Sequence, residues 1–94
     1  MPFVYILQCE DGSLYTGIAK DVARRLAEHL AGRASRYTRS RLPVVLAWSR
    51  RVPSWSHALR EEHRIKALPR GAKLLLLQAG SRHRPSRDAA RSAR

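Results

Sequence analysis

The segment that decides the fold is FVYILQCEDGSLYTGI, residues 3–18. Residues 3–7 are β-branched, aromatic or aliphatic, Glu10-Asp11-Gly12 is typical of a turn, and residues 13–18 can return as a second strand. This pattern predicts a β-hairpin. With a loop of three or five residues centred on Glu10, Tyr5 and Tyr15 would lie directly opposite each other and project from the same face.

Further elements follow the hairpin. Asp21 can cap a helix over residues 22–31, and Gly32 can end it. An arginine-rich loop is expected at residues 32–42, followed by a largely buried strand at residues 43–49.

The second half of the chain is expected to be helical. One helix should begin at Trp55 or His57 and reach Leu68, and a short one should cover residues 72–79 and end before Gly80. The predicted order is β-β-α-β-α-α. We therefore expect an α/β (α+β) fold, with a three-stranded mixed sheet flanked by helices.

The length of 94 residues limits the chain to one small domain, which we place at residues 1–80. Residues 81–94 are rich in arginine, contain no aliphatic residue larger than alanine, and are expected to be a disordered basic tail. No apolar run is long enough for a membrane-spanning helix. The single cysteine, Cys9, excludes an internal disulfide, and the first residues lack the basic leader of a signal peptide. We expect a cytoplasmic protein that can associate with the nucleoid.

The charge indicates an anionic partner. Lysine and arginine number 19 against 7 acidic residues, a net charge of +12, and 16 of the 19 are arginines, whose planar guanidinium groups suit phosphate. Between Arg33 and Arg51 there are six arginines and no acid, with Tyr37 and Trp48 interleaved. This favours nucleic acid, first of all DNA, over the alternative of a merely solvated basic face. The predicted nucleic-acid-binding residues are Arg24, Arg33, Arg36, Tyr37, Arg39 and Arg41.

Two short motifs carry a resemblance to a known family. FVY at residues 3–5 and YTG at residues 15–17 resemble the two motifs of the GIY-YIG nucleases, which lie on neighbouring strands, with Gly17 as the motif glycine. The family has an arginine on its first helix, matched by Arg25, a histidine or tyrosine one turn later, matched by His29, and a glutamate on a later helix, matched by Glu62. The chain is most similar to the small, stand-alone bacterial members.

The resemblance implies a role for each matched residue. Tyr5 would orient the attacking water or the phosphate, Arg25 would bind the phosphate, and Glu62 would hold one Mg²⁺ or Mn²⁺. Either Tyr15 or His29 would be the general base. The implied activity is metal-dependent endonucleolytic cleavage of DNA in repair, recombination or processing. A homodimer would be one way to cut both strands.

Several alternatives remain open on the sequence alone. The two tyrosines could be cross-strand packing partners, Glu62 could pair with Lys66 at i,i+4, and Glu61 could be the ligand if the helical register is shifted by one. The other class of function that fits these residues is a nucleic-acid-binding module with the same fold and little or no hydrolysis.

Overall fold

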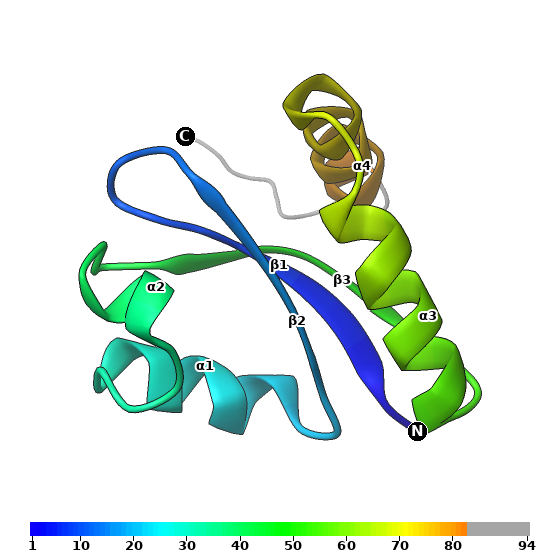
Figure 1. Cartoon of the computed structure of the whole chain (residues 1–94), viewed down its shortest axis with the longest axis horizontal. Helices are drawn as coiled ribbons and strands as arrows, with labels where there is room; N and C mark the ends of the chain where they lie inside the picture. Colours follow the sequence, from blue (N-terminus) through cyan, green and yellow to red (C-terminus); the bar gives the residue numbers. More distant parts are fainter. Residues whose placement is uncertain (83–94) are drawn as a thin grey trace.

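The computed structural model describes residues 1–82, so the expected tail lies almost entirely outside the described residues. Three strands form one sheet: β1 (Phe3–Gln8), β2 (Leu14–Ala19) and β3 (Val45–Arg51) (Figure 1). The strand order is β2-β1-β3, and β1 is antiparallel to both neighbours. The expected α+β fold is confirmed, but the prediction of a mixed sheet is wrong. A mixed sheet needs parallel neighbours, and here the parallel strands β2 and β3 are separated by the central β1.

Four helices complete the described chain: α1 (Val22–Leu30), α2 (Arg36–Arg39), α3 (Trp55–Lys66) and α4 (Arg70–Arg82). The Asp21 side chain caps α1 and the Ser54 side chain caps α3, because each accepts a hydrogen bond from a backbone N–H of the first turn. The element order is therefore β-β-α-α-β-α-α, with α2 in the expected loop. Helix α4 also begins earlier than expected and continues through Gly80. No helix within residues 1–82 has the length and apolar character needed to cross a bilayer.

Both faces of the sheet are buried, and alternate residues of a strand point to opposite faces. On one face Val4, Ile6 and Trp48 pack with residues of α3 and α4. On the other face Tyr5 and Leu7 pack with residues of α1. Figure 1 shows α1 and α2 gathered at one side of the sheet, and α3 and α4 at the other.

The register of the hairpin corrects one expectation. Tyr5 pairs with Gly17 and Leu7 pairs with Tyr15, so the turn is centred on Asp11 rather than Glu10. Tyr5 and Tyr15 are diagonal neighbours, not direct partners, although they do share a face. The turn uses Gly12, whose φ of +86° favours glycine.

Candidate active site

Gly17 provides the space in which the two tyrosines meet. A Cβ at this position would lie 2.6 Å from both Cζ and Oη of Tyr5 and 3.2 Å from Cε2 of Tyr15. Only a residue without a side chain allows the Tyr5 ring to cover its cross-strand partner. The motif glycine is therefore explained by a close side-chain approach, and it is part of the site's geometry.

His29 is the centre of a buried hydrogen-bond chain. Its side chain lies at the last turn of α1 and is only 1% exposed. Its Nε2 atom lies 3.0 Å from Oη of Tyr5, and its Nδ1 atom lies 2.8 Å from Oγ1 of Thr38 in α2. The ring of Tyr15 meets the imidazole edge-on, with centroids 5.1 Å apart.

The contacts of Thr38 determine which group donates and which accepts in each hydrogen bond of this series. Its hydroxyl donates to the carbonyl oxygen of Ser35 at 3.4 Å, which leaves Oγ1 to accept from Nδ1–H of His29. The Nε2 atom then carries the lone pair and accepts the hydroxyl proton of Tyr5. Thr38 thereby selects the tautomer of His29 and the orientation of the Tyr5 O–H bond.

The electrostatics of the site keep Tyr5 protonated and His29 neutral. Burial, helped by the charges of Tyr15 and Glu62, raises the pKa of Tyr5 from 10.0 to about 12, although Arg25 opposes the shift. Burial and then the positive charge of Arg25 lower the pKa of His29 below 6.5. Tyr5 is therefore a hydrogen-bonding phenol at neutral pH. With both nitrogens already bonded, His29 positions Tyr5 and does not face solvent.

Arg25 is the exposed cation of the site. It extends from α1, its side chain is 44% exposed, and its guanidinium donates to Oε1 of Glu28 at 2.8 Å. Glu28 first, and the neighbouring Tyr5 as well, raise the pKa of Arg25. Arg25 and Glu28 also line a cavity of about 240 Å³ at the end of β2, with Trp55 from α3.

The two neighbouring acids of α3 have different surroundings. Glu61 accepts hydrogen bonds from Arg50 at 2.8 Å and Arg64 at 2.9 Å. Glu62 pairs with Lys66 at 3.2 Å, and its charge contributes to the raised pKa of Tyr5. The charge of Glu62, and not that of Glu61, is among the causes of the raised Tyr5 pKa, so Glu62 is the acid linked electrostatically to the tyrosine site. The pair with Lys66 also exists, so the two interpretations of Glu62 are compatible.

The donor set matches only some metals. No group of three or more His, Cys, Asp or Glu side chains in residues 1–82 is arranged to hold an ion. This excludes a closed zinc site from the described part of the chain. Mg²⁺ keeps several waters and often binds through one or two carboxylates plus substrate phosphates, so a lone carboxylate such as Glu62 fits it.

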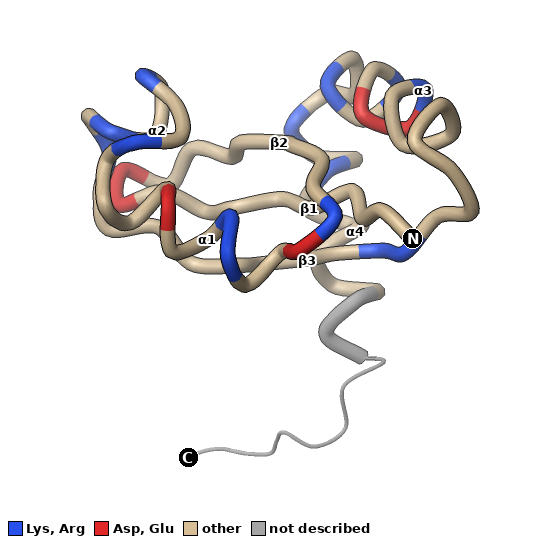
Figure 2. Tube along the Cα trace, turned by 90° about the horizontal axis from the view of Figure 1, so that it is seen from below, with Lys and Arg blue, Asp and Glu red and all other residues tan. Residues whose placement is uncertain are grey.

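The predicted nucleic-acid-binding residues lie mainly on α1, α2 and the connections next to them. Tyr37 contacts the site, because its ring centroid is 5.9 Å from that of Tyr15. Arg41 lies over the Tyr37 ring at 3.9 Å and pairs with Asp11 at 3.1 Å. The remaining members are exposed and do not meet the tyrosines in one cluster: Arg24, Arg33, Arg36 and Arg39. Figure 2 shows positive residues on α1, α2 and α3 and near the end of β3, so the charge is spread over several elements.

Sequence reasoning missed Thr38 and Glu28. Thr38 is fully buried on a helix too short to give a periodic signal. Ser35, which caps this helix through its side chain, was the available signal. Glu28 lies three residues after Arg25, and this spacing could have indicated the ion pair.

Comparison with known proteins agrees with this geometry. The sequence model of the GIY-YIG catalytic domain matches residues 1–73. This chain belongs to the GIY-YIG family. The predicted family resemblance is therefore confirmed, and the match includes β1, β2, α1 and α3, which carry the five candidate catalytic residues.

Similar GIY-YIG relatives are small proteins. A UPF0213 protein of Halobacterium salinarum is 49% identical over 73 residues, which are 78% of this chain and 95% of the relative. A UPF0213 protein of Staphylococcus epidermidis is 46% identical over 78 residues, covering 83% of this chain and 95% of the relative. The solution NMR structure of a UPF0213 protein from Bacillus halodurans is 41% identical and has a TM-score of 0.57, covering 88% of this chain and 90% of that one. The GIY-YIG domain indicates a nuclease-type function, and these relatives' names state no substrate.

Proposed function

We propose that this GIY-YIG protein is a metal-dependent endonuclease that hydrolyses phosphodiester bonds in DNA. The observation that carries the proposal is the chain from Tyr5 through His29 to Thr38, with Tyr15 and Arg25 beside it. A domain that needed the tyrosines only for packing would have no need for an oriented hydroxyl and a neighbouring exposed guanidinium.

The side chains divide the chemistry among them. Hydrolysis adds the oxygen of water to phosphorus and breaks the bond to a sugar oxygen, and the water must lose a proton. Tyr5 remains a phenol and orients the water or the phosphate. The half-buried Tyr15 is the proposed proton acceptor, a role that requires its phenolate form, and the departing sugar oxygen takes up a proton from solvent. Arg25 neutralises charge that grows on the phosphate oxygens. His29 holds Tyr5 in place.

Glu62 is the proposed ligand of one Mg²⁺ or Mn²⁺. When bound, the ion supplies positive charge for the phosphate oxygens and lowers the pKa of its coordinated water. Glu62 must exchange its contact with Lys66, 3.2 Å away, for the ion. Lys66 then becomes available to the phosphate backbone.

Binding should depend mainly on the phosphate backbone. Basic residues on several elements can contact phosphates, so affinity should fall steeply with salt. The proposed setting is DNA repair, recombination or processing in the cytoplasm.

A second candidate is a nucleic-acid-binding module without efficient hydrolysis. One observation favours it: both charged groups of the site have intramolecular partners, Arg25 with Glu28 and Glu62 with Lys66. If substrate does not break these pairs, the protein would bind nucleic acid and leave it intact.

Cleavage of a substrate panel tests the proposal. Labelled linear, nicked, flapped, branched and single-stranded DNA would be incubated with Mg²⁺, Mn²⁺ or a chelator, using the wild type, Glu62→Gln and Glu61→Gln. We expect cleavage that requires the metal, is lost in Glu62→Gln and is retained in Glu61→Gln. Equal loss in the two variants would remove the distinction between these acids. Salt-sensitive binding without any metal-dependent cleavage would favour the second candidate.

A further inference from the structure

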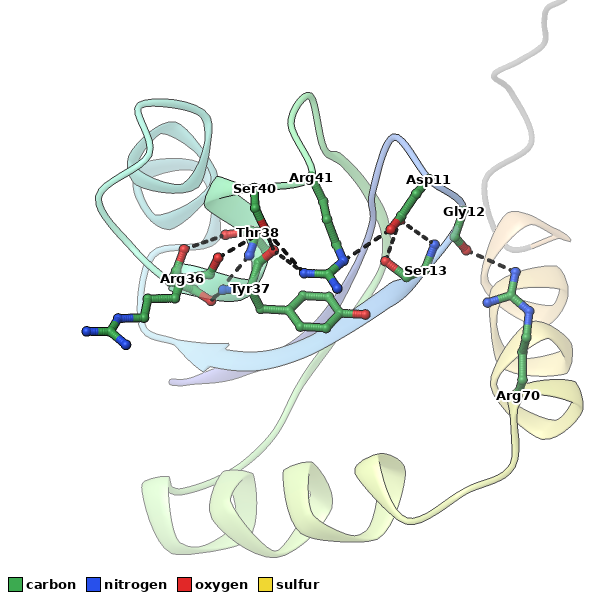
Figure 3. Close-up of polar contacts among 10 residues, drawn as sticks. Asp11, Gly12, Ser13, Arg36, Tyr37, Thr38, Ser40, Arg41 and Arg70 are labelled. Carbon is green, nitrogen blue, oxygen red and sulfur yellow. Dashed lines mark hydrogen bonds and ion pairs between the residues drawn. The ribbon is translucent and has the colours of Figure 1, made fainter.

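A separate small cavity opens beside the candidate active site. It has a volume of about 210 Å³ and lies between the β1–β2 turn, α2 and the start of α4. Its lining residues are Ser13, Leu14, Tyr37, Arg70 and Lys73. Figure 3 shows Tyr37 and Arg70 approaching the hairpin from opposite sides.

The cavity joins the site through Tyr37. This ring lines the cavity and also lies next to Tyr15, with 5.9 Å between the ring centroids. Leu14 is the residue before Tyr15 on β2, so the strand that carries the proposed base also forms the cavity wall. A polymer bound at Tyr15 would therefore lie beside the cavity.

The cations of the cavity are not neutralised by acids within residues 1–82. Neither Arg70 nor Lys73 forms an ion pair there, and Arg70 donates one hydrogen bond, to the carbonyl oxygen of Gly12 at 2.9 Å. The nearby acid, Asp11, is already bonded to Ser13 and paired with Arg41. Gly12 thus holds the Arg70 guanidinium in position while leaving its charge available to an anion.

The volume of the cavity indicates which class of ligand it can hold. Pockets for complete small-molecule ligands or cofactors are usually about 300–1,000 Å³. A cavity of about 210 Å³ instead suits one group of a larger molecule. Two cations beside an aromatic ring are the surroundings in which proteins bind the sugar-phosphate backbone of nucleic acids.

We propose that Arg70 and Lys73 form a second phosphate-binding site, which holds a backbone phosphate next to the bond that is cleaved at Tyr15. This site rests on the proposed function for its place along the strand. Binding at this second site fixes which phosphate of the DNA lies at Tyr15. The Tyr37 ring lies between the phosphate at Tyr15 and the phosphate at Arg70 and Lys73. The residues of this second site on α4 lie outside the motifs that define the active site.

Binding measurements in a chelator separate this site from catalysis, because no metal-dependent cleavage occurs during the titration. The proteins are the full-length wild type, the Arg70→Gln/Lys73→Gln double variant, and an Arg51→Gln control on the far edge strand. For duplex DNA, the slope of log affinity against log salt should become shallower by about 0.9 in the double variant, as for one lost phosphate contact. The slope of the control should fall by less than that of the double variant, because Arg51 pairs with Phe3 at the opposite end of β1 from the hairpin turn.

A series of DNA duplexes, each with one phosphate replaced by a neutral methylphosphonate at a different position, then locates the contact. The wild type should bind about tenfold more weakly when one particular phosphate near the cleavage position is neutral, because a charge-assisted hydrogen bond is lost. The double variant should be insensitive at that position, and the control should retain the wild-type pattern. An unchanged salt slope, or the same sensitivity in the double variant, would overturn the second site.

The two proposals fail differently. If the wild type cleaves DNA but the double variant binds with the wild-type salt slope, the second site is wrong and the nuclease stands. If the double variant loses its position-specific sensitivity but the wild type never cleaves, the second site stands as part of a binding module. A wild type that binds no nucleic acid at all would contradict both.

Discussion

The Nδ1 atom of His29 lies 2.8 Å from Oγ1 of Thr38, and this contact ties helix α2 to the tyrosines of the sheet. Thr38 is fully buried and does not contact solvent. Its effect on chemistry must pass through His29 to Tyr5, which makes Thr38 a positioning residue.

Replacing Thr38 by valine should weaken both stability and catalysis. Valine keeps the shape but leaves Nδ1–H of His29 buried without an acceptor, at a cost of about 1–3 kcal/mol in the free energy of unfolding. We expect kcat to fall about tenfold with little change in KM, because Tyr5 is no longer held. Urea unfolding and steady-state cleavage measure the two effects. Thr38→Ser retains the hydroxyl and should recover most of the kcat; equal rates for the serine and valine variants would argue against the role in positioning.

Gly17→Ala should displace the Tyr5 ring. The added Cβ would lie 2.6 Å from Tyr5, and overpacking of this kind costs about 1–3 kcal/mol of unfolding free energy. Gly71→Ala is the matched control on α4, where a Cβ meets no atom within 4 Å and the change should stabilise the helix by about 0.5–1 kcal/mol. Chemical denaturation of both variants provides the test. Wild-type stability and cleavage in Gly17→Ala would show that Tyr5 does not need this space.

Acid should destabilise the protein through His29. Burial first, and the charge of Arg25 second, hold the pKa of His29 below 6.5, so the unfolded chain takes up this proton more readily than the folded protein. The contribution of neutral His29 is fully present above pH 6.5 and declines as the pH falls towards the lower folded pKa. Urea unfolding between about pH 7.5 and 5 should show this decline.

Two variants identify the residue responsible. His29→Gln should flatten the dependence of unfolding free energy on pH, whereas the exposed His63→Gln should preserve it. The same slope in His29→Gln and the wild type would assign the effect to other groups.

Removing the negative charge of Glu28 should strengthen DNA binding. Glu28 holds the exposed guanidinium of Arg25 at 2.8 Å and competes with a phosphate for it. Because partly exposed pairs contribute only about 0–1 kcal/mol, Glu28→Gln should change the unfolding free energy little. Fluorescence anisotropy should show a gain in DNA affinity larger than that of Glu10→Gln, an equal change of charge on the hairpin turn. Equal gains would show a general charge effect and no competition at Arg25.

The sequence predicted the hairpin but misplaced the centre of its turn. Strand alternation predicts that Tyr5 and Tyr15 project from the same face of the sheet. This prediction was correct even though the turn was centred one residue too early. That shift could not be avoided, because Glu10-Asp11-Gly12 allows either centre, and only the space over Gly17 selects one. The direction of β3 depends on how the chain crosses the sheet, which its apolar pattern does not encode.

The burial of His29 could not be predicted from the sequence either. Its helical position lies beside the apolar stripe, so the pattern on α1 is equally compatible with a surface histidine. What buries it is α2, four residues long, which helical periodicity cannot detect. The i,i+4 pair of Glu62 with Lys66 was expected as an alternative and is present, whereas the i,i+3 pair of Arg25 with Glu28 was not predicted.

Single-turnover cleavage by Tyr15→Phe tests the central claim most directly. Phenylalanine keeps the ring that lies against His29 and removes only the hydroxyl proposed to take the proton from water. With DNA bound to excess enzyme and Mg²⁺ or Mn²⁺ present, we expect the cleavage rate to fall by at least about 100-fold, with unchanged unfolding free energy and DNA affinity. Cleavage by this variant at the wild-type rate would contradict the claim that Tyr15 is the base of a nuclease site.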